Sequence, residues 1–511
     1  MQKNAVFAGF LLTLLGMVSI SSHPILDEGS YLWIAKRFSF AKPYDWPLPF
    51  PPFDDAFVFA HPPLLLMWIA ILQKLGLSGW FLKLAAGTPL WFLLGYASYR
   101  LCELYSSEPK KSFAMWLSLP IVMMACSRTA MPDLMMCSFA TTAMWFYAEG
   151  QKKEGSEQNA TRNFFCSAMF LGWASWCKYP ALLLFFPLFM TIKNPTKHAL
   201  PILVGFLGVW GMGEIFLYLS YGKVHLIEVV IRAIEIPRGP LHNRFVGFAL
   251  RLLVGAPLLF WGFQRLRWNT GALTVSLFCV LICAWSMWEM SSVPTILMGF
   301  LSLGFFGYHI GFLIFDSQNR VTMERRLLQL WVVVVWVGIV ATHNYAAPRY
   351  WILAMLPMVL LIPPSQIKTS WIGLCALWSV GLLWAEHQFA NQGFLAAQHV
   401  LEEQEKKNNT TPQYFTGEWT FRWTLQEEGW IFAPQMEHQR QQLDKQKICA
   451  QPKNAIATEC FRYTNQTWSG DSFPLILMDV DNQISYYSET AGYWPIGFSF
   501  DQNRPLEEIR Y

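Results

Sequence analysis

Residues 199–221 read ALPILVGFLGVWGMGEIFLYLSY, a run of 23 residues with one charged side chain, Glu214. At about 1.5 Å per helical residue, this run is long enough to cross the ~30 Å hydrocarbon core of a bilayer. The sequence therefore predicts an all-α polytopic membrane protein and excludes a soluble enzyme, a fibrous protein and a disordered chain. Further apolar stretches lie at roughly 5–20, 61–77, 81–99, 112–127, 132–148, 164–177, 180–192, 245–263, 270–288, 292–315, 328–343, 349–363 and 370–385.

Charge is sparse and unevenly distributed along the chain. Of 511 residues, 54% are hydrophobic and 14% are charged, whereas about a quarter of a soluble domain is charged. Residues 1–386 hold 28 Lys/Arg and 18 Asp/Glu, and residues 387–511 hold 10 and 16. We therefore expect a membrane domain at 1–386 and a polar domain at 387–511. The basic excess lies in loops, so it does not indicate nucleic-acid binding.

Loop charge predicts which stretches cross the membrane, because short cytoplasmic loops collect Lys and Arg. If residues 61–77 lie on the outer surface without crossing, the inside loops hold 15 basic residues and the short outside loops hold only Arg128, Lys178 and Arg349. We therefore expect thirteen crossings in the cell inner (plasma) membrane, a cytoplasmic N-terminus and an outside C-terminal domain. The long outside loops would then be 21–80 and 222–244.

The outside domain is expected to be a small α/β unit. Residues 419–428 have the pattern of a short helix, and residues 473–480 that of a buried strand. Cys449 and Cys460 are its only cysteines. We predict that they form a disulfide if the compartment is oxidising.

Three carboxylates are predicted at the outer membrane face. Asp27 and Glu28 directly follow the first apolar stretch, and Asp133 opens the stretch that follows a tight turn. Carboxylates at this depth are costly unless they are solvated, paired or metal-bound. They are candidates for catalysis, and helix capping is the structural alternative for each.

Three basic residues occupy the short outside turns on the same face. Arg128, Lys178 and Arg349 could each be an interface anchor with its charge held in water. Together with the nearby acids they favour a phosphate site, because Arg and Lys bind phosphate through charge-assisted hydrogen bonds.

Two further outside segments contain candidate residues. Residues 42–63 are rich in Pro and aromatics and end in His61-Pro62-Pro63, where His61 could bind an anion or a metal or serve structure alone. Residues 224–236 predict an interfacial helix whose polar face holds His225, Glu228, Arg232 and Glu235. That face either meets water or covers a cavity.

Five short motifs occur in order, with apolar stretches between them: LDEGSY at 26–31, HPPL at 61–64, RTAMPD at 128–133, CKYPA at 177–181 and PRY at 348–350. Together they resemble the C-type (GT-C) membrane glycosyltransferases, in the branch of the protein O-mannosyltransferases and the bacterial lipid A aminoarabinose transferase. The segment FTGEWTFR at 415–422 also resembles the extracytoplasmic domain of bacterial members. The resemblance spans most of the chain.

The resemblance implies inverting transfer of a sugar from a polyprenyl-phosphate carrier to a lipid, protein or polysaccharide acceptor on the outer face. It implies that Asp27 is the base or orients the acceptor, with Glu28 beside it, and that Asp133 shapes the donor or metal site. It also implies that Lys178 and Arg349 hold the carrier phosphate, with Arg128 assisting. The other substrate-binding candidates are His61, Arg232 and Tyr350.

Two alternatives stay open. The aminoarabinose transferase has a metal-binding Glu at a position where this chain reads Ala60-His61, so a divalent metal ion is left open as a cofactor. A non-catalytic transporter or lipid flippase is the other reading. Such proteins place ionisable groups near the bilayer midplane, and Glu214 is the clearest acid within an apolar stretch.

Overall fold

The structure is a computed structural model. It describes residues 2–25, 27–45, 61–153, 157–235, 251–252, 254–258, 274, 277, 323–342, 347–406, 414–415, 419–432, 449–452, 467–469, 474–479, 484–485, 497–498 and 508–510.

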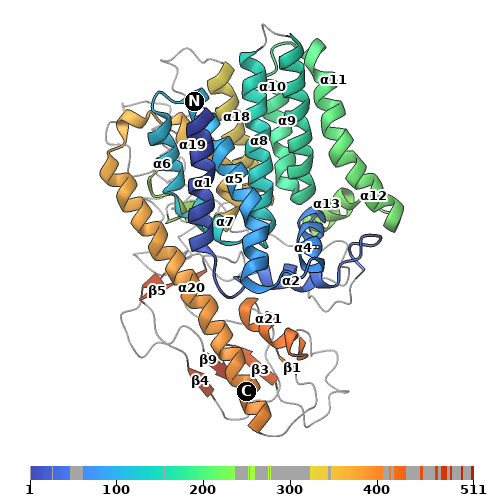
Figure 1. The fold of residues 1–511 in the computed structure, drawn as a ribbon, viewed down its shortest axis with the longest axis vertical. Coiled ribbons are helices and arrows are strands. Elements are labelled where there is room, and N and C mark those ends of the chain that lie inside the picture. The colour runs from blue at the N-terminus through green and yellow to red at the C-terminus, as the bar shows by residue number, and fades with distance from the viewer. Residues whose placement is uncertain are drawn as a thin grey trace.

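Long helices stand side by side in an upright bundle (Figure 1). They include α1 (Gln2–Ser19), α5 (Gly79–Tyr105), α8 (Pro132–Lys152), α9 (Glu157–Cys177) and α18 (Met323–Thr342). Small residues set the closest contacts, as they commonly do between membrane helices. A Cβ added at Gly95 of α5 would lie 2.7 Å from the carbonyl oxygen of Ala8 in α1. Glycine there allows the two backbones to approach.

Several predicted stretches are divided in the structure. The stretch 112–127 forms α6 (Pro109–Leu117) and α7 (Pro120–Ser127), with Pro120 in the first turn of the second helix, where its missing N–H costs little. The quoted run 199–221 lies in one helical run of three parts, all within Pro195–Tyr221. The other short elements are η1 (Tyr179–Leu184), α10 (Phe185–Met190), α11 (Pro195–Phe206), the π-helical turn η2 (Leu207–Gly211), α12 (Met212–Tyr221), η3 (Pro348–Trp351), α19 (Ile352–Leu361) and η4 (Pro364–Gln366).

Within the described residues, two helical runs are long and apolar enough to cross a membrane, Pro195–Tyr221 and Arg325–Thr342. The predicted stretches 245–263, 270–288 and 292–315 lie largely outside the described residues. The number of crossings and their orientation therefore stay predictions.

Short helices lie at the lower end of the bundle: α2 (Glu28–Lys36), α4 (Leu64–Lys74) and α13 (His225–Glu235) (Figure 1). With 11 residues, α4 has about half the length needed to cross a bilayer. The expectation that residues 61–77 do not cross stays a prediction, because the stretch 112–127, which is expected to cross, also forms helices of only 9 and 8 residues.

The longest helix links the bundle to the C-terminal part. The 38 residues of α20 (Thr369–Lys406) run without a break past position 386 and descend from the bundle to the sheet region (Figure 1). Within the bundle, Ser379 Oγ donates to the carbonyl oxygen of Ser118 at 2.6 Å. Lower down, Ala396, Ala397 and Val400 pack with the C-terminal part.

The described C-terminal residues contain one helix and short strands. The predicted helix 419–428 corresponds to α21 (Trp419–Glu427), and the predicted strand 473–480 to β5 (Leu475–Ile476) and β6 (Met478–Asp479). A five-stranded sheet has the order β2-β1-β3-β9-β4, and β5 and β6 pair with β8 and β7. The other strands are β1 (Tyr414–Phe415), β2 (Ile431–Phe432), β3 (Cys449–Pro452), β4 (Thr467–Ser469), β7 (Ile484–Ser485), β8 (Gly497–Phe498) and β9 (Glu508–Arg510).

The predicted disulfide cannot be placed on this framework. Cys449 begins β3, but Cys460 lies outside the described residues. The bond stays a prediction.

Candidate functional site

Two ion pairs bring together four of the predicted site residues. Lys178 Nζ lies 2.8 Å from Asp133 Oδ1, and both side chains are buried. Arg349 Nη1 lies 3.1 Å from Asp27 Oδ2, and here the Asp27 side chain is 43% exposed. The turns that loop charge assigns to one face therefore meet in space, with one acid enclosed and one within reach of solvent.

Helix capping does not account for either acid. Asp27 occupies the N-cap position of α2 but makes no side-chain capping hydrogen bond. Asp133 lies inside the first turn of α8, whose N-cap is Met131. The local sequence thus positions both carboxylates at helix starts, while their side chains point to cations from other segments.

Tyr350 lies against both cations. Lys178 Nζ is 4.7 Å from the centre of its ring, and Arg349 Cζ is 5.2 Å from the same centre. Arg349 Nη2 also donates to the Tyr350 hydroxyl at 3.4 Å. Cation–π contact of this kind fixes long basic side chains without neutralising them.

His61 lies beside this cluster. Its ring stacks on Tyr31 of α2 with 6.4 Å between centres, and its carbonyl oxygen accepts a hydrogen bond from the Tyr44 hydroxyl at 3.0 Å. Desolvation by burial lowers the pKa of His61 well below its usual range, and the charges of Lys178 and Arg349 lower it further, against Asp133. His61 is therefore neutral near pH 7.

Two polar atoms of the site retain unused hydrogen-bonding capacity. Asp133 Oδ2 and Arg349 Nε are buried, and neither bonds to any residue within the described ranges. Buried polar atoms are normally satisfied. An acceptor and a donor are thus open to a ligand beside the two ion pairs.

Glu28 is enclosed in a different set of contacts. It is fully buried and pairs with Lys83 of α5 at 2.9 Å. Its Oε2 accepts the Ile25 amide and its Oε1 the Ala130 amide, each at 3.0 Å. These bonds tie the start of α2 to α5 and to the turn before α8. Glu28, predicted to be catalytic, is fully engaged in holding the fold.

Arg128 is likewise committed to a partner that the sequence did not indicate. Its Nε donates to Glu386 Oε1 of α20 at 3.0 Å, and its Nη2 pairs with the same atom. Ser127 Oγ donates to the second oxygen of Glu386 at 3.3 Å. This buried group joins α7 to α20 and engages the Arg128 guanidinium, and the predicted role of Arg128 in phosphate binding stays a prediction.

The predicted polar face of α13 is split. Arg232 is partly exposed and pairs with Glu235 at 3.3 Å, whereas His225 is buried. His225 Nδ1 bonds to the Tyr179 hydroxyl at 2.5 Å, and that hydroxyl also donates to Glu214 at 2.6 Å. This network anchors the start of α13 to Tyr179, which directly follows Lys178. Arg232 stays at the surface.

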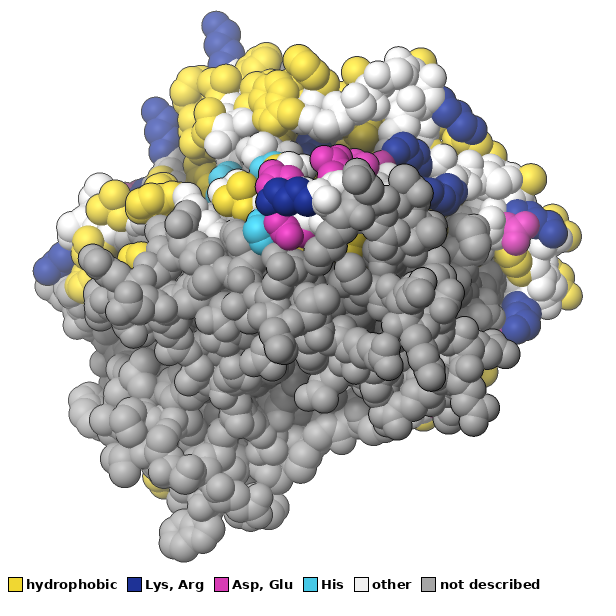
Figure 2. Space-filling view, turned by 90° about the horizontal axis from the view of Figure 1, so that it is seen from below, with side chains coloured by type: hydrophobic (Ala, Val, Ile, Leu, Met, Phe, Trp, Pro, Cys, Tyr) yellow, Lys and Arg dark blue, Asp and Glu magenta, His cyan; other side chains and the backbone are white. Residues whose placement is uncertain are grey.

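Histidine, acidic and basic side chains gather on the face of the molecule seen from below (Figure 2). No group of three or more His, Cys, Asp and Glu side chains suited to hold a metal ion occurs among the described residues. In that part of the chain, His61 therefore does not complete a metal site with the aspartates.

No protein-family model and no curated protein matches this chain. Two solved structures are similar to it, both of ArnT from Cupriavidus metallidurans, which is a lipid A aminoarabinose transferase. The structure bound to undecaprenyl phosphate has 15% identity, a TM-score of 0.47, and coverage of 84% of this chain and 86% of that chain. The apo structure has 16% identity, a TM-score of 0.46, and coverage of 86% and 90%. At these values the similarity assigns no activity or residue role to this chain.

Proposed function

We propose that the protein is a C-type membrane glycosyltransferase, which moves a sugar from a polyprenyl-phosphate carrier to an acceptor at the outer face of the inner membrane. The observation that carries the proposal is the convergence of Asp27, Asp133, Lys178 and Arg349 in two ion pairs around Tyr350. The domains 1–386 and 387–511, with a cytoplasmic N-terminus, belong to the same proposal.

Lys178 and Arg349 are proposed to bind the carrier phosphate. Both cations contact one aromatic ring, so their positions are fixed before a ligand arrives. Arg349 also retains the buried Nε as a donor. Positive charge held in place at the leaving group stabilises the negative charge that develops on the phosphate as the glycosidic bond breaks.

Asp27 is proposed as the general base. The acceptor hydroxyl oxygen would form the new bond to the anomeric carbon while the bond from that carbon to the phosphate oxygen breaks. The electron pair of that bond leaves with the phosphate, and the acceptor proton passes to the Asp27 carboxylate. Attack opposite the leaving group inverts the configuration. The exposure of Asp27 gives an acceptor access to this acid.

Asp133 is proposed to act as a positioning residue. Its Oδ1 holds the Lys178 ammonium, and burial strengthens this pairing because water does not screen it. Its Oδ2 is open and could accept a hydroxyl of the donor sugar. Glu28 and Arg128 are proposed to stabilise the frame around the site.

The surroundings of Glu214 favour the enzyme over a transporter. Its carboxylate accepts the Tyr179 hydroxyl and, at 3.2 Å, the Leu226 amide. It thereby caps the start of α13, which lies at the same lower end of the bundle as α2, the helix that Asp27 precedes (Figure 1). A transport site would call for such a group near the midplane.

The direct test is sugar transfer by the purified protein in lipid nanodiscs. Candidate polyprenyl-phosphate sugars would be supplied with extracted envelope lipids, proteins and polysaccharides, and products identified by mass spectrometry. The proposal expects inversion at the anomeric carbon and loss of transfer in Asp27→Asn. Movement of the carrier across the membrane without any glycosidic product would instead support a flippase.

A further inference from the structure

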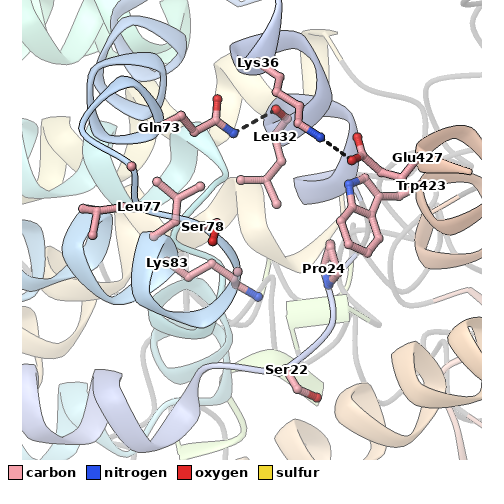
Figure 3. Close-up of a pocket in the computed structure, with 13 residues that line it drawn as sticks. Ser22, Pro24, Leu32, Lys36, Gln73, Leu77, Ser78, Lys83, Trp423 and Glu427 are labelled. Atoms are coloured by element: carbon pink, nitrogen blue, oxygen red, sulfur yellow. Dashed lines mark hydrogen bonds and ion pairs between the residues drawn. The ribbon is translucent and has the colours of Figure 1, made fainter.

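A cavity of about 410 Å³ lies on another side of α2 from the ion pairs. Its wall is formed by α2, the turn between α4 and α5, and α21 of the C-terminal part (Figure 3). Asp27 and Tyr31 lie one helical turn apart, whereas Leu32 and Lys36, which line the cavity, project from a nearly opposite face at about 100° per residue. The cavity is therefore distinct from the candidate site but shares a helix with it.

Trp423 of α21 forms the aromatic part of the wall (Figure 3). It packs closely on α2, since a Cβ added at Gly29 would lie 2.5 Å from Trp423 Cβ. Glycine at this position lets the C-terminal part dock against α2. The cavity thus exists only where the two parts of the chain meet.

Polar groups stand around the indole. Lys36 and Glu427 form an exposed ion pair at the edge of the cavity (Figure 3). Gln73 Nε2 donates to the Leu32 carbonyl oxygen at 3.3 Å, while its buried Oε1 bonds to no residue in the described ranges. The wall therefore offers carboxylate, ammonium and amide groups next to a flat apolar surface.

Lys83, also in the wall, does not supply a cation to a ligand. Its Nζ is bonded to Glu28 at 2.9 Å and to the carbonyl oxygens of Ser21 and His23 at 3.1 and 3.3 Å. The exposed Lys36 ammonium is balanced by Glu427. The wall charges are therefore compensated, and among the described residues no buried cationic atom of the wall lacks a partner, in contrast to Arg349 Nε of the candidate site. This favours a neutral polyhydroxylated ligand over an anion.

We propose that this cavity binds a saccharide ring, stacked on Trp423 and hydrogen-bonded by Glu427 and Gln73. Its volume lies in the usual range for small-ligand pockets, which combine apolar surface with a few orienting polar groups. That the ring belongs to the acceptor rests on the proposed function, but the binding itself does not.

The saccharide could be a free sugar or the head group of a lipid, and one experiment with two sets of probes distinguishes them. Exposed apolar side chains of Ile71, Leu75 and Phe81 adjoin the turn that lines the cavity, so a lipid-anchored sugar could enter from the bilayer. The probes are methyl glucoside and methyl N-acetylglucosaminide, and the same two sugars on a dialkyl lipid in the nanodisc. Binding of either form supports the site, and their relative affinity identifies the source.

Saturation-transfer NMR and calorimetry on the full-length protein, in nanodiscs free of glycoside detergent, would measure the binding. Trp423→Ala should weaken it by roughly 5- to 150-fold, the factor that corresponds to about 1–3 kcal/mol for a ring stacked on one aromatic side chain. Glu427→Gln should also weaken it. Trp80→Ala is the matched control: Trp80 is an exposed tryptophan of α5 outside the cavity wall, and its loss should leave binding unchanged.

A second variant protects the test against misfolding, since Trp423 also supports docking on α2. Ser78 lies in the exposed turn and makes no side-chain cap, so Ser78→Trp should fill the cavity, abolish binding and keep the melting temperature. The proposal is overturned if the wild type binds neither probe, or if Ser78→Trp and Trp423→Ala both bind as tightly as wild type. Asp27→Asn should bind the probes normally, because Asp27 lies outside the cavity wall. If the wild-type protein binds the probes but transfers no sugar, the proposed function is refuted and the saccharide-binding cavity stands.

Discussion

Asp27 accepts a hydrogen bond from Arg349 across 322 positions of sequence, at 3.1 Å, although it stands at the N-cap of α2. A capping aspartate would turn its carboxylate to the first amides of its own helix. This carboxylate turns instead to a guanidinium that also touches Tyr350. The contact joins the first and last of the membrane-face motifs and places an accessible acid beside a cation.

The Lys178–Asp133 pair predicts coupled effects on stability. Lys178→Gln or Asp133→Asn alone should lower the free energy of unfolding by about 3–5 kcal/mol, because each leaves a buried charge without its partner. The double variant should recover much of this stability, since both charges are gone. Thermal unfolding of the four proteins would give the coupling energy.

Donor affinity should not recover together with stability in the Lys178→Gln/Asp133→Asn double variant. The double variant lacks the Lys178 ammonium, so its donor affinity should stay weakened by roughly 1.5–3 kcal/mol, the range for hydrogen bonds to charged groups. Equal donor binding by wild type and double variant would show that Lys178 is structural only.

Glu28 should behave as a residue of the frame. Glu28→Gln removes the charge that balances buried Lys83, so the melting temperature should fall. The double variant Glu28→Gln/Lys83→Met should regain stability, because no buried charge remains. Turnover per folded molecule should stay close to wild type in this double variant. A loss of ~100-fold or more at restored stability would return Glu28 to a catalytic role.

His61 should make stability depend on pH. Its pKa is lowered by burial and by Lys178, so between the folded pKa and about 6.5 the unfolded chain binds more protons than the native protein. The free energy of unfolding should therefore fall as pH drops from about 7.5 toward 5.5, by at most about 1.4 kcal/mol per pH unit from this residue.

The control for this prediction is His61→Gln, which cannot titrate. Its unfolding free energy should change less than that of wild type over the same pH range. Parallel pH profiles for the two proteins would mean that His61 is protonated alike in both states.

The predicted Cys449–Cys460 disulfide also remains to be measured. The chain-entropy model gives a short closed loop a value on the order of 3 kcal/mol. Peptide mapping of unreduced protein should find the two residues linked, and Cys460→Ser should lower stability only under oxidising conditions. Two free thiols in protein from an oxidising compartment would refute it.

The sequence predicted which turns lie on the same side of the membrane, because basic residues concentrate in cytoplasmic loops. It could not assign partners on that side. Arg128 was predicted to bind phosphate, yet it pairs with Glu386, 258 positions away. Such a choice depends on how α7 packs against α20, which no local pattern determines.

A signal for the missed partners was nevertheless present. Lys83 lies inside the predicted stretch 81–99, and Glu386 directly follows the stretch 370–385. A charge within an apolar helix is expected to have a partner. Applied to these two residues, that rule predicts buried pairs, although Glu28 and Arg128 follow as the partners only once the helices are packed.

The central claim is tested most directly by the transfer rate of Asp27→Asn with a purified carrier-linked sugar, measured beside Asp45→Asn, which replaces an exposed acid of the same outside segment. Asn keeps the size of Asp and one of its hydrogen-bonding oxygens, and both carboxylates are in contact with solvent, so both variants should keep a melting temperature close to wild type. Loss of a general base should lower turnover of Asp27→Asn by ~10²–10⁴-fold, with Asp45→Asn unchanged. Wild-type turnover in folded Asp27→Asn would contradict the account.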